Sequence, residues 1–382
     1  MSAAAAAAAE PGRPPRCLVG CALVASEAAA NIARQCRSNP RLLSMLVEEK
    51  CDSEANRNRF AHDFKTLADV LVQHVVAKRF GLQFPELDGS IYGEENDTIK
   101  NNKGRDVTIK VGETVAETLR CLSEALDDDL ESAKSLAEAA HREFTLSDLN
   151  VDRYPCEEEE HIDLKRIGIW IDPIDSTNEY INGNVDNVNE YGFHSSGLHC
   201  VTINIGLFDK YTGKPIAGVI NQPFFKCDSA ERWIGRCYWA FCGGQKGLHS
   251  LPEFVSCEQE LVVISNSETD AARVALQRSG YTVATASGAG YKLLCVALGV
   301  VKCYALTKDS TYAWDTCAAH AMLASLGGTV CRRGGPAEPL TYRPKGDAGQ
   351  GQARHCNAGG IIASRDPRTV DRVHALLLDC NR

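Results

Sequence analysis

The chain has 382 residues, of which 44% are hydrophobic and 24% are charged. These values are ordinary for a globular protein and exclude collagen-like, coiled-coil and wholly disordered chains. At about 150 residues per domain the length predicts two domains. With 41 Lys and Arg against 50 Asp and Glu the net charge is −9, which disfavours broad binding to duplex nucleic acid because phosphate contacts need a basic face.

The cysteines indicate a reducing compartment. There are 17 of them, an odd number, and no C-x-x-C spacing occurs. In a chain of this size that pattern favours reduced thiols over a disulfide framework or a zinc site. No apolar run reaches the roughly 18 residues that span a membrane. We therefore expect a cytoplasmic protein with no membrane or nucleic-acid partner, and no obligate protein partner is evident.

The N-terminus allows two interpretations. Residues 1–16 are rich in alanine and proline and are predicted to be a disordered lead-in. The apolar run at 17–25 that follows Arg13 and Arg16 is similar to the core of a signal peptide. Glu27 follows at once, however, and the apolar positions from 18 to 33 fit one face of a helix. We favour a helix that runs to Arg37.

Apolar periodicity and turn residues predict the elements up to residue 242. In chain order these are a helix at 42–50, a helix that opens at Asp63 and is ended by Gly81, a strand at 90–93, helices at 114–126 and 130–141, a solvated loop at 157–160, and strands at 167–171, 199–208, 216–224 and 236–242.

A polar segment at 251–260 is predicted to separate two domains. Beyond it, strands and helices alternate, which is typical of an α/β layer structure. The predicted elements are a strand at 261–265, helices at 269–279 and 291–298, a strand at 302–307, a helix at 315–326, strands at 329–331 and 360–364, and a helix at 367–378. We expect an α+β metal-binding domain at 17–252 and an α/β substrate-side domain at 253–382.

The most informative stretch is Trp170-Ile-Asp172-Pro-Ile-Asp175-Ser-Thr177, in which an apolar strand ends at an acid and a second acid follows three residues later. The proline fixes a turn, and a helix can begin after the second acid. Asp172, the carbonyl of Ile174 and Asp175 can then point at one place, and Mg²⁺ prefers such oxygen ligands. The free N–H groups of the helix start favour an anion beside the metal. A capped turn with two exposed aspartates is the alternative.

Other acids also stand at the ends of predicted elements. Glu94 and Glu95 follow a strand. Asp315 precedes a helix, and Asp63 opens one. Each alone is readily explained as a helix cap or a solvated residue. With the two aspartates of the previous stretch they make six carboxylates at element ends, which is where sites beside a sheet are built.

The three acidic segments together resemble a known motif set. Gly93-Glu-Glu95, Asp172-Pro-Ile-Asp-Ser-Thr177 and Trp314-Asp-Thr-Cys-Ala318 look like the ordered motifs of the magnesium-dependent, lithium-sensitive phosphatase superfamily, which includes inositol monophosphatases, bisphosphate nucleotidases and fructose-1,6-bisphosphatases. Segments at 63–73, 197–202, 218–224 and 237–239 resemble its inositol polyphosphate 1-phosphatase branch. The likeness covers roughly residues 50–365. It implies an αβαβα sandwich of the α/β class, with the site at the junction of the two domains.

The resemblance also implies roles for matching positions. The implied metal ligands, for two or three Mg²⁺ ions, are Glu94, Glu95, Asp172, the Ile174 carbonyl, Asp175 and Asp315. The implied catalytic residues are Glu94, together with Asp63 and Thr177, which would polarise the attacking water. The implied substrate contacts are Asp175, Ser176, Thr177, Ser265, Ser267, Gly288 and Lys292. The asparagine-rich stretch 182–196 is expected to be particular to this protein.

The function that the resemblance implies is removal of the 1-phosphate from inositol 1,4-bisphosphate and inositol 1,3,4-trisphosphate, with inhibition by lithium. A 3′(2′),5′-bisphosphate nucleotidase is the alternative within the class, since both kinds of substrate carry a second phosphate. A non-catalytic inositol-phosphate-binding protein is the alternative from another class. The complete set of carboxylates argues against that last alternative.

Overall fold

The computed structural model describes residues 17–39, 47–49, 64–101, 103–154, 162–244, 247–252, 259–344 and 352–378. Three predictions concern residues outside these ranges: the lead-in at 1–16, the position of Asp63 and the loop at 157–160. Of the described helices, none combines the length and apolar character that crossing a bilayer requires.

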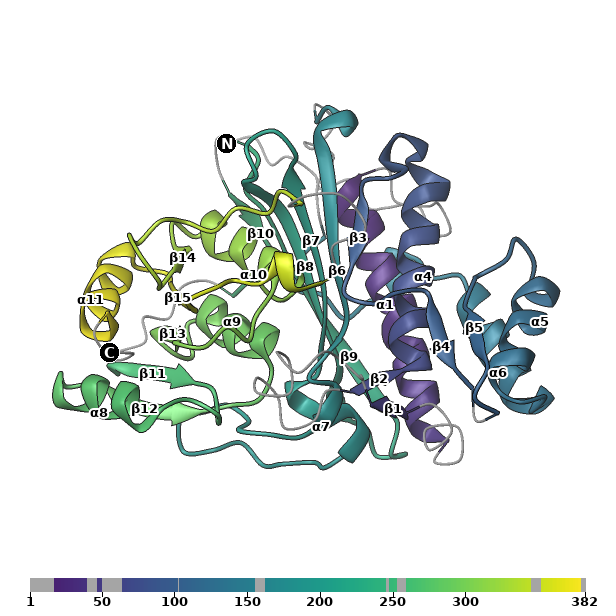
Figure 1. Ribbon diagram of the computed structural model, residues 1–382, viewed down its shortest axis with the longest axis horizontal. Helices are drawn as coiled ribbons and strands as arrows, with labels where there is room; N and C mark the ends of the chain where they lie inside the picture. The colour runs from purple at the N-terminus through teal and green to yellow at the C-terminus, as the bar shows by residue number, and fades with distance from the viewer. Residues whose placement is uncertain are drawn as a thin grey trace, which may run out of the picture.

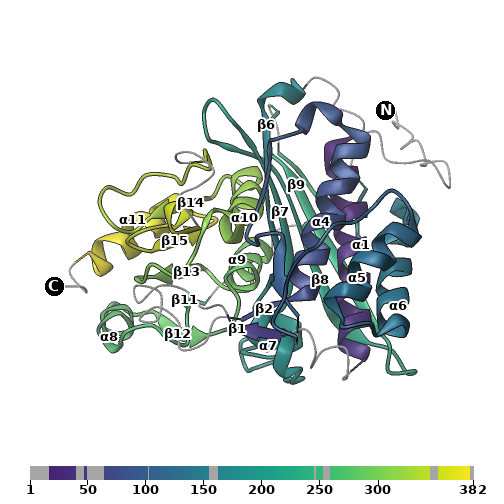
Figure 2. The same ribbon diagram turned by 45° about the vertical axis from the view of Figure 1, so that its right-hand side comes forward.

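Two sheets and three sets of helices form alternating layers (Figures 1 and 2). The first sheet contains, from edge to edge, β10 (Leu248–His249), β9 (Trp233–Phe241), β8 (Pro215–Cys227), β7 (Thr202–Asp209), β6 (Ile167–Asp175) and β3 (Ile91–Gly93). The second contains β12 (Thr282–Thr285), β11 (Leu261–Ile264), β13 (Cys303–Leu306), β15 (Ile361–Ser364) and β14 (Thr329–Arg332).

The helices separate and cover these sheets. α1 (Leu18–Ser38) and α4 (Leu67–Gln83) lie on the outer face of the first sheet, and the pair α5 (Val115–Ala125) and α6 (Leu130–His141) packs beyond them. α9 (Ala289–Leu298) and α10 (Ala313–Ser325) lie between the two sheets, and α8 (Asp270–Arg278) and α11 (Pro367–Leu377) cover the outer face of the second. The expected αβαβα sandwich is confirmed.

Strand direction differs between the sheets. In the first, β3 is parallel to β6, and the other neighbours are antiparallel. In the second, β12, β11 and β13 are parallel, and β15 is antiparallel to both β13 and β14. The first sheet ends in the sequence at His249 and the second begins at Leu261. α9 and α10 from the second part also pack on the first sheet. We propose that the two domains divide at residue 252.

Two glycines bring α10 close to the first sheet. A Cβ on Gly218 of β8 would lie 2.1 Å from the carbonyl oxygen of Ala318, and one on Gly206 of β7 would lie 2.6 Å from the nitrogen of Ala318. Any larger residue at either position would push the helix outward. This close approach fixes the distance between the first sheet and α10, whose first turn carries Asp315.

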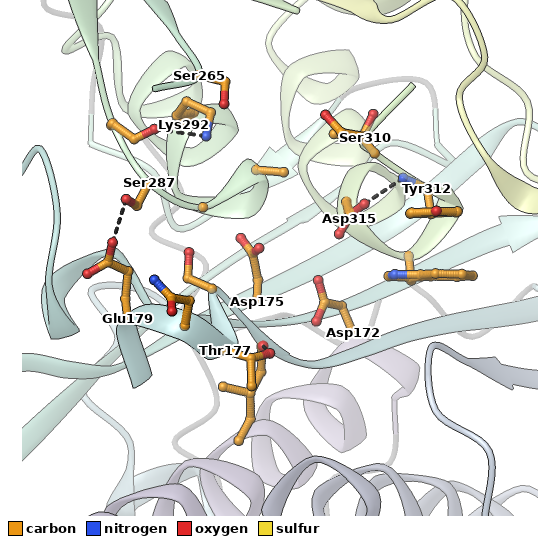
Figure 3. A pocket seen from close by; sticks show the side chains of 18 of the residues that line it. Asp172, Asp175, Thr177, Glu179, Ser265, Ser287, Lys292, Ser310, Tyr312 and Asp315 are labelled. Atoms are coloured by element: carbon orange, nitrogen blue, oxygen red, sulfur yellow. Dashed lines mark hydrogen bonds between the residues drawn. The ribbon is translucent and has the colours of Figure 1, made fainter. Parts of the chain in front are cut away.

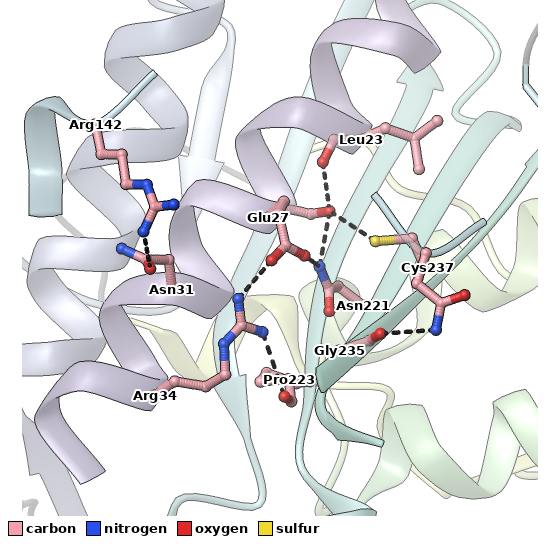
Figure 4. A network of polar contacts seen from close by, with 11 residues as sticks. Leu23, Glu27, Asn31, Arg34, Arg142, Asn221, Pro223, Gly235 and Cys237 are labelled. Atoms are coloured by element: carbon pink, nitrogen blue, oxygen red, sulfur yellow. Dashed lines mark hydrogen bonds and ion pairs between the residues drawn. The ribbon is translucent and has the colours of Figure 1, made fainter. Parts of the chain in front are cut away.

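A buried polar network fixes α1 on the same sheet (Figure 4). The guanidinium of Arg34 forms an ion pair with Glu27 and donates to the carbonyl oxygen of Pro223 at 3.3 Å. Asn221 of β8 donates from Nδ2 to the second Glu27 oxygen at 3.2 Å. The helix is otherwise buried along nearly its whole length, so these directional contacts define its position in a way that its apolar surface alone does not. The predicted helix through Arg37 is confirmed.

Two predictions about elements need correction. Residues 47–49 form a strand, β1 (Val47–Glu49), which pairs with β2 (Phe64–Thr66), so the predicted helix at 42–50 is wrong there. The next helix begins at Leu67 and not at Asp63, because Thr66 caps it and forms a capping box with Asp69. Strand β12 was not predicted. The remaining small strands, β4 (Thr98–Lys100) and β5 (Asp106–Thr108), form a separate hairpin.

Candidate active site

A pocket of about 390 Å³ opens where β6, α9 and α10 meet (Figure 3). Its wall includes most of the residues that the sequence indicated, namely Glu94, Asp172, Ile174, Asp175, Ser176, Thr177, Ser265, Ser267, Gly288, Lys292 and Asp315. The fold therefore brings together residues separated by more than two hundred positions. Glu95 is buried and lies beside the pocket without lining it. Asp63 lies outside the described residues.

Three carboxylates form the floor of the pocket. One oxygen each from Asp172, Asp175 and Asp315 lies within 4.8 Å of the others. Strand β6 continues through Asp175, and its pairing with β7 is irregular between Asp172 and Asp175. This irregularity lets two acids that are three residues apart point to the same side. The strand that was predicted to end at Asp172 therefore continues to Asp175.

Asp315 reaches the cluster from the first turn of α10. Its Oδ2 accepts the N–H of Tyr312 at 2.5 Å, so the carboxylate closes a capping box on that residue. Asp315 is therefore not the helix cap that its residue type suggested, because Tyr312 occupies the N-cap position and Asp315 lies three residues further on. The bond holds one carboxylate oxygen and leaves the other for the pocket.

The surrounding donors leave part of the cluster unsatisfied. Asp175 Oδ2 accepts the N–H of Gly290 at 2.7 Å and the hydroxyl of Thr202 at 3.4 Å. Asp172 Oδ2 accepts from Asn204 at 3.2 Å, whereas its Oδ1 is buried and has no hydrogen-bond partner in the described part of the chain. A buried oxygen without a donor is costly unless a ligand supplies the missing interaction.

Repulsion among the buried carboxylates also favours binding of a cation. Burial raises the pKa of Asp172 well above its usual range, and the nearby charges of Glu94, Asp175 and Asp315 raise it further. Burial likewise raises the pKa of Asp315, with Asp175 and Glu94 adding to the effect. A divalent cation removes this repulsion, and carboxylate oxygens are the ligands that Mg²⁺ accepts. The residues present therefore fit the expected Mg²⁺.

Glu94 and Glu95 follow β3, at the edge of the same sheet. The backbone N–H of Glu94 donates to the carbonyl oxygen of Ile171 at 3.1 Å and so extends the pairing with β6. Gln73 of α4 holds the next residue, because its side chain donates to the carbonyl oxygen of Glu95 at 2.6 Å and accepts the N–H of Glu95 at 2.9 Å. A Cβ on Gly93 would lie 2.0 Å from Gln73 Oε1. Only glycine permits this contact, which aims Glu94 into the pocket.

The turn after β6 places Thr177 against Ile174. The hydroxyl of Thr177 donates to the carbonyl oxygen of Ile174 at 3.1 Å. Ser176 between them has φ of 69° and ψ of 47°, a left-handed conformation that a non-glycine residue seldom adopts. Helix α7 (Thr177–Asn182) then begins at Thr177, as the sequence predicted. The turn thus places Thr177 in the lining of the pocket, with its hydroxyl against the carbonyl oxygen of Ile174.

The opposite wall carries the residues expected to contact substrate. Ser265 and Ser267 share a hydrogen bond at 3.0 Å in the turn after β11. Lys292 is only 4% exposed, and its Nζ donates to the carbonyl oxygen of Ala286 at 3.0 Å and lies 5.2 Å from the centre of the Tyr304 ring. Burial lowers the pKa of Lys292, and the carboxylate of Asp175 opposes that shift. Of the described residues that line the pocket, Lys292 alone brings a cation.

Several residues of the site escaped the sequence analysis. They are Thr202, Asn204, Glu179, Ser287 and Tyr312. A usable signal existed for two of them, because Thr202 and Asn204 are polar residues two apart in an otherwise apolar strand and so share one face. Nothing in the sequence marks Ser287 or Tyr312, whose places depend on contacts between distant segments.

Comparison with known proteins agrees with this geometry. The family model described as the inositol monophosphatase family matches residues 92–377. The human inositol polyphosphate 1-phosphatase is 38% identical over an alignment that covers 93% of this chain and 96% of the human protein. The mouse 3′(2′),5′-bisphosphate nucleotidase 1 is 27% identical, with 80% of each chain covered.

Solved structures support the fold. The extragenic suppressor protein suhB of Bartonella henselae superposes with a TM-score of 0.52 at 13% identity, covering 94% of this chain and 98% of that one. The IMPase of Thermotoga maritima gives a TM-score of 0.50 at 13% identity, covering 94% and 95%. The sequence relatives and the matched family model therefore confirm the resemblance: the chain belongs to the inositol monophosphatase family and is a phosphatase with Mg²⁺ as its cofactor.

Proposed function

We propose that this phosphatase removes the 1-phosphate from inositol 1,4-bisphosphate and inositol 1,3,4-trisphosphate and that lithium inhibits it. The observation that carries the proposal is the 38% identity to the human inositol polyphosphate 1-phosphatase over nearly the whole of both chains. The described pocket supports it, since all four candidate carboxylate ligands that the sequence placed there, together with Thr177 and Lys292, line a single cavity that also includes Glu179.

The carboxylates would hold two or three Mg²⁺ ions. Glu94, Asp172 and the carbonyl of Ile174 form one candidate ligand set, with Glu95 in support. Asp172, Asp175 and Asp315 form the other. Bound Mg²⁺ supplies charge neutralisation for the phosphate and a lowered pKa for a water molecule.

Thr177 and the cluster would orient the nucleophile. The Thr177 hydroxyl already donates to the carbonyl oxygen of Ile174, so its lone pairs remain to accept a hydrogen bond from a water molecule in the pocket and orient it. Asp63 would share this task, as the resemblance implies. The backbone N–H groups of Ser176 and Thr177 would bind oxygens of the phosphate that is removed.

The opposite wall would bind the rest of the substrate. Lys292 is a buried cation, and an anion at its Nζ would gain a charge-assisted hydrogen bond that water does not weaken. We assign it the second phosphate of the substrate. Ser265, Ser267 and the backbone of Gly288 would contact the inositol ring and that phosphate.

We also propose a cytoplasmic location for the protein. All 13 cysteines in the described ranges are free thiols, which supports a reducing, cytoplasmic compartment. We also propose, as the sequence indicated, that the chain acts on its substrate without an obligate protein partner.

The test is phosphate release from inositol 1,4-bisphosphate, inositol 1-phosphate and adenosine 3′,5′-bisphosphate, each in Mg²⁺ with and without lithium. We expect preference for the first substrate and loss of that activity in lithium. Preference for the nucleotide would replace the proposal with the nucleotidase function. No release from any of them, with Mg²⁺ still bound, would indicate a binding protein.

Asp172→Asn tests, in the same assay, whether the three-aspartate cluster is needed for catalysis. We expect it to abolish turnover, because the variant loses a charge that no other ligand replaces. Asp106→Asn, an exposed aspartate of β5, is the matched control and should keep the activity of the wild type. Wild-type turnover in Asp172→Asn would contradict the assignment of the cluster.

A further inference from the structure

Outside Glu94 and the three-aspartate cluster, two charged residues line the pocket within the described ranges: Lys292 and Glu179. They have opposite charges. Lys292 suits a phosphate, as argued above. A carboxylate in a pocket for a polyanion needs a different explanation, because it repels the phosphates that the pocket must bind.

Glu179 is held firmly in place (Figure 3). Its Oε1 accepts the hydroxyl of Ser287 at 2.7 Å, and its Oε2 accepts the backbone N–H of Gly197 at 2.7 Å. These donors come from the segment before α9 and from the residue that follows the asparagine-rich stretch 182–196. Each carboxylate oxygen has a second lone pair, so Glu179 can still accept a hydrogen bond from a ligand hydroxyl.

The hydrogen bond to Ser287 also fixes the position of Glu179 relative to the three-aspartate cluster. A Cβ on the next residue, Gly288, would lie 2.8 Å from the hydroxyl of Ser176 and 3.1 Å from Asp175 Oδ2. The backbone beside Ser287 thus lies directly against the floor of the pocket. Since Glu179 is one hydrogen bond away from Ser287, its carboxylate borders the space that the ring of a bound substrate would occupy.

We propose that Glu179 is a specificity-determining residue, which accepts a ring hydroxyl of the polyol phosphate and excludes phosphate groups from its corner of the pocket. This rests on the proposed function and deepens it. A hydroxyl is a donor and gains from a fixed carboxylate, whereas a phosphate in the same position meets a like charge. A carboxylate that repels phosphate in this way limits how many phosphates a tightly bound ligand can carry.

The experiment compares Glu179→Gln with Ser287→Ala. The first variant removes the charge and keeps the shape, and the second keeps the charge and removes the hydrogen bond. The ligands are uncleavable 1-methylenephosphonate analogues of inositol 1,4-bisphosphate and inositol 1,3,4,5-tetrakisphosphate. Their dissociation constants are measured by calorimetry in Mg²⁺, and selectivity is the ratio of the two constants.

We expect Glu179→Gln to reduce the preference for the bisphosphate analogue about tenfold, the size of one screened charge contact. Ser287→Ala should leave the ratio within about twofold of the wild type, since the carboxylate charge remains. An unchanged ratio in a folded Glu179→Gln would overturn the proposal. Equal losses of selectivity in Glu179→Gln and Ser287→Ala would also overturn it, because the hydrogen bond between Ser287 and Glu179, and not the charge of Glu179, would then be responsible.

Failure of the proposed function gives a different result. The wild-type chain would then bind neither inositol analogue. In that case the dissociation constants of inorganic phosphate and pyrophosphate test whether Glu179 repels charge. Glu179→Gln should bind pyrophosphate more tightly relative to phosphate than the wild type does. An unchanged ratio of the two constants would count against the proposal.

Discussion

The backbone N–H of Gly290 donates to Asp175 Oδ2 over 2.7 Å and thereby connects the end of β6 to the first turn of α9. A Cβ on Gly290 would lie 2.6 Å from the hydroxyl of Thr202, so a side chain at this position would prevent the approach. The same turn of α9 carries Lys292. One contact therefore sets the position of the pocket's cation relative to a candidate metal ligand.

Thr177→Val should lower kcat by about 10²- to 10⁴-fold, the usual range for losing a group that assists proton transfer. Valine keeps the volume but can neither accept a hydrogen bond from the water molecule nor donate one to the carbonyl oxygen of Ile174. Thr177→Ser should restore most of the activity, because it keeps the hydroxyl. Steady-state kinetics in Mg²⁺ measures both variants. Activity of Thr177→Val within threefold of the wild type would contradict this role.

Lys292→Met should lower kcat/KM on inositol 1,4-bisphosphate by about 10- to 100-fold, since a buried charge-assisted hydrogen bond contributes about 1.5–3 kcal/mol. Methionine has a similar shape and no charge. The loss on inositol 1-phosphate should be much smaller, because that substrate has no second phosphate. The control is Lys134→Met on the exposed face of α6. Equal losses on both substrates would show that Lys292 does not bind the second phosphate.

Glu27→Ala should destabilise the fold by about 2–4 kcal/mol, because it leaves the mostly buried Arg34 without its partner. It also removes an acceptor from Asn221. Glu138→Ala breaks an exposed ion pair with Lys134 on α6 and should cost less than about 1 kcal/mol. Urea unfolding of the three chains measures the difference. Similar losses in both variants would mean that the network does not anchor α1.

His320 should make the fold sensitive to acid. Burial lowers the pKa of His320 to about 3, and its Nδ1 lies 2.9 Å from the hydroxyl of Tyr342. The unfolded chain takes up a proton near pH 6.5 and the folded chain does not, so the free energy of unfolding falls as the pH drops below about 6.5. By pH 5 this one group should account for a loss of about 2 kcal/mol.

His320→Asn isolates that contribution. Asparagine can keep a hydrogen bond to Tyr342 but has no proton to gain. Urea unfolding at pH 7.5 and pH 5 should therefore show a difference between the two pH values that is about 2 kcal/mol smaller in the variant than in the wild type. The same difference in both chains would place the acid sensitivity elsewhere.

Most elements could be predicted because their signal is local. Helix α6 has the predicted bounds, and the first five residues of strand β6 are an apolar run that the sequence displays directly. The errors occurred where pairing between distant residues outweighs local preference. Residues 47–49 are a strand because they pair with 64–66. Strand β12 is short and half-exposed, and it exists through parallel pairing with β11.

The metal-ligand candidates could be named because their motifs are short and ordered along the chain, and family membership is visible in those same residues. Their arrangement could not be read from the chain. It depends on the irregular pairing at Asp172 and Asp175, on the close approach of α10 permitted by Gly206 and Gly218, and on the contact between Gly290 and Asp175. Glu179 acquires its place only through Ser287 and Gly197. Such contacts join residues far apart in the sequence, and no local periodicity or motif specifies which distant groups will meet.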